Sequence, residues 1–119
     1  MQGILTTAVI DATRGTPAQG MLVDLFRLPP SGGERRHLKT IETNGEGGVE
    51  RPLLAGDEFQ PATYELFYHI GRYFKAQGGA REEAPFLDVV PVRFALAHPT
   101  RPCHVALVVT PLAYTMYRS

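Results

Sequence analysis

The sequence predicts an all-β protein: a two-sheet antiparallel Greek-key sandwich with one short helix. Twelve glycines and ten prolines interrupt the 119-residue chain at short intervals, and such residues mark turns. The apolar residues between them form short runs rich in β-branched and aromatic side chains, which favour strands over helices. A chain of this length builds one core, so we expect a single domain over residues 1–119.

The expected elements follow from these runs in chain order. Strands are predicted at Ile4–Ile10, Met21–Leu28, His37–Thr43, Val49–Leu54, Thr63–Ile70, Phe86–Leu96, Cys103–Val109 and Tyr114–Arg118. The pair Asn44-Gly45 separates two of these runs and predicts a hairpin between them. Only Gly71–Gly79 has a helical pattern, and its closing glycines are a typical stop signal.

The strand at Phe86–Leu96 carries two further predictions. Pro91 cannot donate a ladder hydrogen bond, so this strand is expected at a sheet edge or at a bulge. Residues two apart share a face of a strand, which groups Phe86, Val90, Val92, Phe94 and Leu96 on one side.

Charge and composition exclude several function classes. Twelve basic and twelve acidic side chains balance, which is not the pattern of a nucleic-acid binder or a polybasic membrane anchor. No apolar run approaches the roughly 20 residues of a membrane span, and the first residues lack a secretory signal. Cys103 is the only cysteine, so no internal disulfide is possible and the protein suits a reducing compartment. We therefore expect a cytoplasmic protein that binds neither nucleic acid nor membrane.

Several segments resemble the transthyretin and 5-hydroxyisourate hydrolase family, in the family's order and over nearly the whole chain. They are "LTTAVIDATRGTPAQG" (Leu5–Gly20), "TNGEGG" (Thr43–Gly48), "ATYELFYHIGRYF" (Ala62–Phe74), "FLDVVPVRF" (Phe86–Phe94) and "HVALVVTPLAYTMYRS" (His104–Ser119). The resemblance implies a sandwich that pairs edge to edge into dimers, which pack face to face as a homotetramer around a central channel. It also implies a small-molecule ligand there. The hydrolases of the family open the ring of 5-hydroxyisourate, a product of urate oxidation, with an activated water.

Two positions of the hydrolase pattern are replaced in this chain. The histidine of the first strand is Ala8, and the arginine after the turn glycine is Gly48. Opening a cyclic amide or amidine with water requires a base and a group that stabilises the oxyanion, and neither replacement supplies one. Arg51 lies three residues beyond Gly48, an odd offset that places it on the opposite strand face unless a bulge intervenes. With a bulge, Arg51 is a candidate substrate-binding residue.

Other positions of the pattern are retained. His104 matches the histidine of the later strand, and Tyr117, Arg118 and Ser119 match the Tyr-Arg-Gly-Ser ending without its glycine. His104 alternates with small side chains on its strand, so its face suits a channel wall that Ala8 also lines. We assign His104 and Tyr117 as catalytic candidates, and Ala8, Arg118 and Ser119 as substrate-binding candidates. His104, Tyr117 and Arg118 also have structural interpretations: a packing histidine, a tetramer contact and a surface ion pair, respectively.

The remaining histidines, His37, His69 and His98, lack metal-ligand spacing, and the sequence predicts neither a metal nor a cofactor. Three hypotheses stay open. The chain is a homotetrameric hydrolase that acts on 5-hydroxyisourate or on another small cyclic molecule, a small-ligand-binding protein like transthyretin, or a structural remnant or partner subunit without a ligand.

Overall fold

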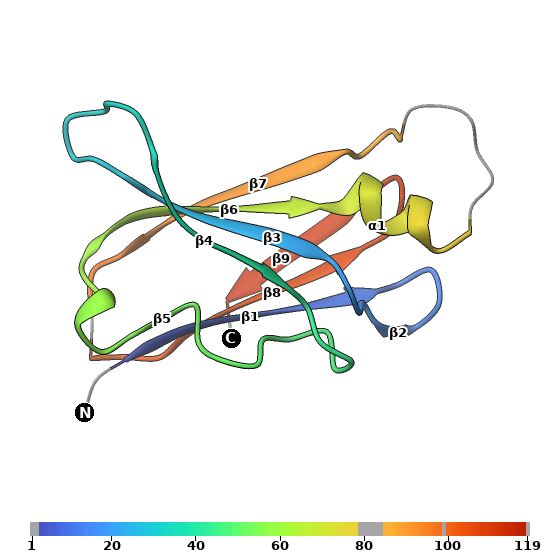
Figure 1. Ribbon diagram of the computed structural model, residues 1–119, viewed down its shortest axis with the longest axis horizontal. Coiled ribbons are helices and arrows are strands. Elements are labelled where there is room, and N and C mark those ends of the chain that lie inside the picture. The colour runs from blue at the N-terminus through green and yellow to red at the C-terminus, as the bar shows by residue number, and fades with distance from the viewer. Residues whose placement is uncertain (1–2, 79–84, 99, 119) are drawn as a thin grey trace.

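The computed structural model describes residues 3–78, 85–98 and 100–118, and it confirms the predicted all-β sandwich. Two sheets pack against each other, with one short helix, α1 (Ile70–Ala76), at one end of the sandwich (Figure 1). A 3-10 turn covers Gly56–Glu58. The described strands are β1 (Ile4–Asp11), β2 (Thr16–Pro17), β3 (Leu22–Leu28), β4 (Arg36–Glu42), β5 (Leu54–Ala55), β6 (Ala62–His69), β7 (Val89–Leu96), β8 (Cys103–Val109) and β9 (Tyr114–Arg118).

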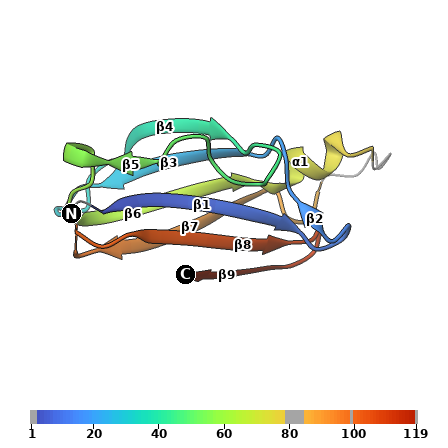
Figure 2. The same cartoon turned by 90° about the horizontal axis from the view of Figure 1, so that it is seen from below.

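The strands divide into two sheets with different edges. The β1 sheet has the order β2-β1-β8-β9, with β5 also paired to β1, and the β3 sheet has the order β4-β3-β6-β7. All strand pairs are antiparallel except β1 with β8, which run parallel. The parallel pair puts strands from the two ends of the chain side by side in the β1 sheet and leaves β9 at its edge (Figure 2).

The core lies between the sheets and follows from the alternation along each strand. Leu5 and Val9 of β1 and Leu107 of β8 are fully buried on one face, while the alternate residues, such as Thr6 and Ala8, belong to the other face. Leu66 and Tyr68 of β6 are buried in the opposing layer. Each large aliphatic side chain buried in this way contributes about 1.5–3 kcal/mol. The same alternation determines which side chains the β1 sheet presents on its outer face.

The segment Val49–Leu54 is not the second strand of a hairpin; it crosses from one sheet to the other. Asn44 does form a tight turn, because its carbonyl accepts a hydrogen bond from Gly47 N–H at 2.9 Å. The turn then lies against β1, where the Gly47 carbonyl accepts from Val9 N–H at 2.8 Å, and β5 pairs with β1. Gly47 has a φ of +77°, and a Cβ there would lie 2.4 Å from the Val9 carbonyl oxygen, so only glycine fits. The predicted hairpin is wrong because the segment after Asn44 forms hydrogen bonds with the free edge of β1 instead of with β4.

Strand β7 is shorter than the predicted strand Phe86–Leu96, but it lies at a sheet edge, as Pro91 predicted. It begins at Val89, because its partner β6 ends at His69 and offers no ladder beyond that point. Phe86 therefore lies outside the strand and is 77% exposed. The other four residues of the predicted face are on one side of the strand, with Val90, Val92 and Leu96 buried and Phe94 half-buried. Strand β7 is an edge of the β3 sheet, as expected for a strand with proline in it.

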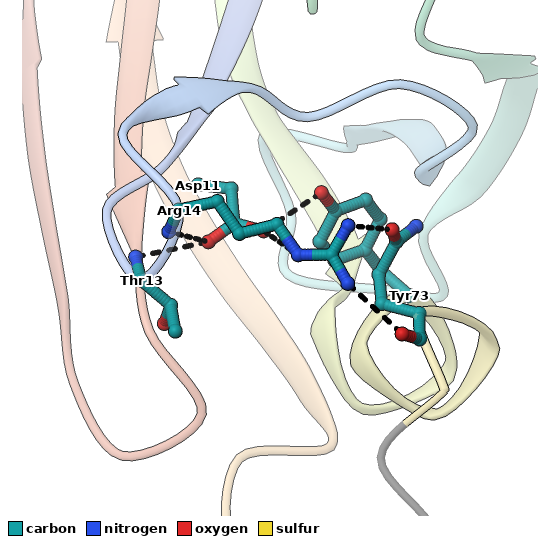
Figure 3. Close-up of polar contacts among 5 residues, drawn as sticks. Asp11, Thr13, Arg14 and Tyr73 are labelled. Carbon is teal, nitrogen blue, oxygen red and sulfur yellow. Dashed lines mark hydrogen bonds and ion pairs between the residues drawn. The ribbon is translucent and has the colours of Figure 1, made fainter.

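The buried carboxylate of Asp11, at the end of β1, is hydrogen-bonded to helix α1 (Figure 3). Asp11 accepts hydrogen bonds from the Thr13 and Arg14 N–H groups and from the Tyr73 hydroxyl, the last at 2.9 Å. Arg14 in turn donates to the side chain and carbonyl of Gln77, just after the helix. Burial and the neighbouring Asp11 raise the pKa of Tyr73 to about 12, which keeps the phenol protonated as a donor.

The helix begins one residue before the predicted Gly71, and it ends at Ala76. Gly78 follows it with a φ of +90°, consistent with the predicted glycine stop, whereas the expected last residue, Gly79, lies outside the described residues. Within residues 3–78, 85–98 and 100–118, no helix has the length and apolar character needed to cross a membrane.

Candidate functional site

The outer face of the β1 sheet carries three of the residues that the sequence singled out: Ala8, His104 and Tyr117. Because residues opposite each other on neighbouring strands share a face, the registers arrange these side chains in rows. The rows are Thr6 with His104, then Ala8 with Ala106 and Tyr117, then Ile10 with Val108 and Thr115. No side chain in these rows bears a permanent charge. We call this set of residues the outer face below.

His104 is the one titratable nitrogen group of this face, and it is anchored. Its Nδ1 lies 2.8 Å from the Thr6 hydroxyl oxygen, and both residues are half-buried. Among the described residues, the other ring nitrogen, Nε2, has no hydrogen-bond partner. An imidazole with one nitrogen hydrogen-bonded and the other free has the arrangement of a general base.

Sequence reasoning missed Thr6. Its spacing could have revealed it, because Thr6 is two residues before Ala8 and therefore lies on the same face of the strand. Its contact with His104 joins residues 98 positions apart and depends on the parallel register of β1 and β8, which no local pattern indicates.

Tyr117 and Ala8 lie in one row across the sheet, whereas Arg118 does not. Ala106 pairs with both Ala8 and Tyr117, and Tyr117 is 49% exposed at the sheet edge. Arg118 pairs with Val105, so it belongs to the opposite face of the sheet. Ser119 lies outside the described residues.

Gly48 lies beside Ala8 in the structure. A Cβ added to Gly48 would be 3.7 Å from the Thr7 carbonyl oxygen, in the peptide that precedes Ala8. The two replaced positions of the family pattern are therefore neighbours. Arg51 lies further along the same crossing segment and is exposed. Since that segment is not a strand, its odd offset from Gly48 no longer decides which way Arg51 faces.

A buried polar contact supports the outer face from behind. The Thr7 hydroxyl donates to the Val105 carbonyl at 2.8 Å and lies 2.8 Å from the Tyr68 hydroxyl. Burial raises the pKa of Tyr68, so this phenol stays neutral and hydrogen-bonded. Cys103 is buried on the same inner face, and burial also raises the pKa of its thiol. These interactions hold β1 and β8 together behind Thr6 and His104.

A cavity of about 380 Å³ lies elsewhere, next to α1, and none of the predicted site residues lines it. Phe74, Lys75 and Leu112 form part of its wall. No group of three or more potential metal ligands occurs in the part of the chain that the structure describes. The candidate site is therefore an open sheet surface rather than a closed pocket within one chain.

The fold and this surface define a class of protein: a β-sandwich with one anchored imidazole on the outer face of one sheet. The chain belongs to the HIUase/Transthyretin family, whose model matches residues 5–119.

Similar proteins include both a 5-hydroxyisourate hydrolase and a transthyretin. The chain is 43% identical to 5-hydroxyisourate hydrolase 2 of Rhizobium meliloti (strain 1021), over 98% of this chain and 95% of that protein. The structure of (S)-allantoin synthase matches with a TM-score of 0.91 at 36% identity, over 99% of this chain and 44% of the larger one. Sea bream transthyretin in complex with thyroxine matches with a TM-score of 0.84 at 27% identity, over 97% and 93% of the two chains.

Proposed function

We propose that this protein is a hydrolase that opens a small cyclic amide or amidine on the outer face, with 5-hydroxyisourate as the first substrate to test. The observation that carries the proposal is the placement of His104. The imidazole is anchored by Thr6, its Nε2 is free among the described groups, and Ala8 and Tyr117 flank it on one face. The similarity to a 5-hydroxyisourate hydrolase over nearly the full chain supports the choice of substrate.

His104 acts as the base in this proposal. Water gives a proton to Nε2 as its oxygen attacks the carbonyl carbon; the C–N bond then breaks, and the leaving nitrogen takes the proton. The Tyr117 hydroxyl is the candidate donor to the developing oxyanion. Ala8 leaves space for the ring of the substrate, and Arg51, Arg118 and Ser119 are the candidates for polar contacts to it.

The replacements at Ala8 and Gly48 imply slow turnover on 5-hydroxyisourate. A general base and an oxyanion donor each contribute about a hundredfold or more in rate. Loss of the first-strand histidine and of the neighbouring arginine leaves His104 as the one strong proton acceptor of the outer face. A related ring-opening reaction on a less demanding substrate is compatible with the same residues.

We further propose that the site is completed by a homotetramer in the cytoplasm. All five residues of β9 are exposed, and Ile10 of the outer face is 44% exposed. Apolar edges and faces of this kind are covered in stable proteins. Sedimentation should give a mass near 52 kDa for four chains of 13.1 kDa. A mass of one chain would contradict this assembly.

The activity is tested with freshly generated 5-hydroxyisourate, whose decay is followed by absorbance against the spontaneous reaction. The wild type should accelerate the decay, and His104→Ala and Tyr117→Phe should lose most of that acceleration. His98→Ala, an exposed loop histidine, is the matched control and should keep it. No acceleration by the wild type would exclude this substrate, and equal activity in all variants would exclude the assigned residues.

A second candidate function is small-ligand binding without catalysis. The observation that favours it is the largely apolar outer face with no permanently charged side chain, and apolar walls with few polar groups are typical of ligand sites. Aromatic acids and purine analogues would then raise the thermal midpoint, since a ligand selective for the folded state stabilises it. A shift that Ala106→Glu abolishes would support binding at this face. No shift with any compound would favour a subunit without a ligand.

A further inference from the structure

We propose that Thr6 is the positioning residue of His104. Its hydroxyl accepts the hydrogen bond of Nδ1–H and so leaves Nε2 unprotonated, as the nitrogen that faces the substrate. The inference rests on the proposed function of the outer face and names a residue that the family pattern in this sequence does not include.

The contact is built into the most regular part of the β1 sheet. Thr6 and His104 are direct partners in the parallel β1–β8 register, which continues over Leu5–Asp11 and Cys103–Val109. Their side-chain atoms lie 2.8 Å apart, an ordinary hydrogen-bond length. The register holds the two backbones opposite each other, so the side chains start from neighbouring points of the sheet.

The hydroxyl of Thr6 has no structural task that competes with this contact. The neighbouring Thr7 donates to the Val105 carbonyl and contacts Tyr68, so its hydroxyl belongs to the core. Thr6 points to the other face, and in the described chain its hydroxyl oxygen contacts only His104 Nδ1. A hydroxyl that serves one imidazole nitrogen selects the position of the ring proton.

A hydrogen-bond partner on Nδ1 helps His104 to act as a base. When Nε2 takes a proton from water, both ring nitrogens become donors. The Thr6 oxygen can accept the hydrogen bond from Nδ1 in the neutral and in the charged state, and hydrogen bonds to a charged group are the stronger ones. Ala8 and Gly48 offer no side chain for the same task. Loss of a charge-assisted hydrogen bond corresponds to roughly a tenfold to a hundredfold loss of rate.

The test compares Thr6→Val, which keeps the shape and removes the hydroxyl, with Thr6→Ser, which restores it. Thr63→Val makes the same substitution at a half-buried position of β6, in the other sheet and away from the outer face, and serves as the matched control. Two readouts are used: kcat and KM for 5-hydroxyisourate, and the ¹⁵N shifts of the His104 ring, which report the protonated nitrogen without any substrate.

Thr6→Val should lower kcat about 10- to 100-fold with a smaller change in KM, and the ring should change from one tautomer to a mixture. Thr6→Ser should restore both properties, and Thr63→Val should alter neither. An unchanged tautomer in folded Thr6→Val would overturn the inference, as would a serine variant that restores neither property. If the wild type does not act on 5-hydroxyisourate, that substrate fails, and the ring shifts alone then decide whether Thr6 positions His104.

Discussion

Restoring the two replaced positions should raise the rate at which the protein opens 5-hydroxyisourate, if the proposed function holds. The double variant Ala8→His with Gly48→Arg supplies the base and the cation that the family pattern has at these positions. The structure places the two positions side by side along β1, because a Cβ on Gly48 would lie 3.7 Å from the Thr7 carbonyl oxygen. The two new side chains would therefore be attached to neighbouring backbone positions, one on β1 and one in the turn beside it.

The size of the effect follows from chemistry and from the space available. A general base and an oxyanion-stabilising cation are each worth about a hundredfold in rate, or about 2.7 kcal/mol of barrier. The expected gain is therefore about a hundredfold for each single variant, and at most about ten-thousandfold for the pair. Little of this gain should be lost to misfolding. Contact distances at Gly48 are ordinary, and its φ is outside the left-handed region.

The assay is the absorbance decay of 5-hydroxyisourate, together with a thermal midpoint for each variant. Gly48→Gln has a long polar side chain without charge and should give little gain. Gly47→Arg should instead unfold the turn, since its Cβ would lie 2.4 Å from the Val9 carbonyl oxygen. A folded double variant that is no faster than the wild type would refute the argument that these two losses limit the reaction.

The remaining predictions concern stability. Tyr73→Phe leaves the buried Asp11 without its phenol donor and should lower the free energy of unfolding by about 1–3 kcal/mol, measured with urea; an unchanged midpoint would contradict this. Because the pKa of Tyr73 is raised from 10.0 to about 12, the unfolded chain ionises first. Wild-type stability should therefore fall as the pH rises through that interval, and the fall should be smaller in Tyr73→Phe. For Asp24, burial raises the pKa, but hydrogen bonds from Thr40 and His69 outweigh it and leave the pKa below the ordinary 3.8. Its carboxylate thus stabilises the fold above that pH and loses this effect below it. The stability difference between wild type and Asp24→Asn should narrow in acid, and a constant difference would contradict the assignment.

Local sequence patterns predicted most of the strands, because a strand has a period of two that its own residues display. The face of His104 was predicted from alternation, and the edge position of the strand with Pro91 was predicted from the N–H donor that proline lacks. Where the prediction of an element failed, pairing with a strand far away in the sequence determined the structure of that segment. Val49–Leu54 has the composition of a strand, but the open edge of β1 draws the chain across to the other sheet.

The sequence by itself determined the sandwich class, the family resemblance and the identity of the residues lost at positions 8 and 48. Only the tertiary structure decided that β1 and β8 are parallel, that Thr6 therefore meets His104, and that Arg118 lies on the face opposite Tyr117. The physical reason is the range of the interactions. Strand periodicity arises between residues two apart, whereas direction and register are chosen by hydrogen bonds and packing between segments about a hundred residues apart.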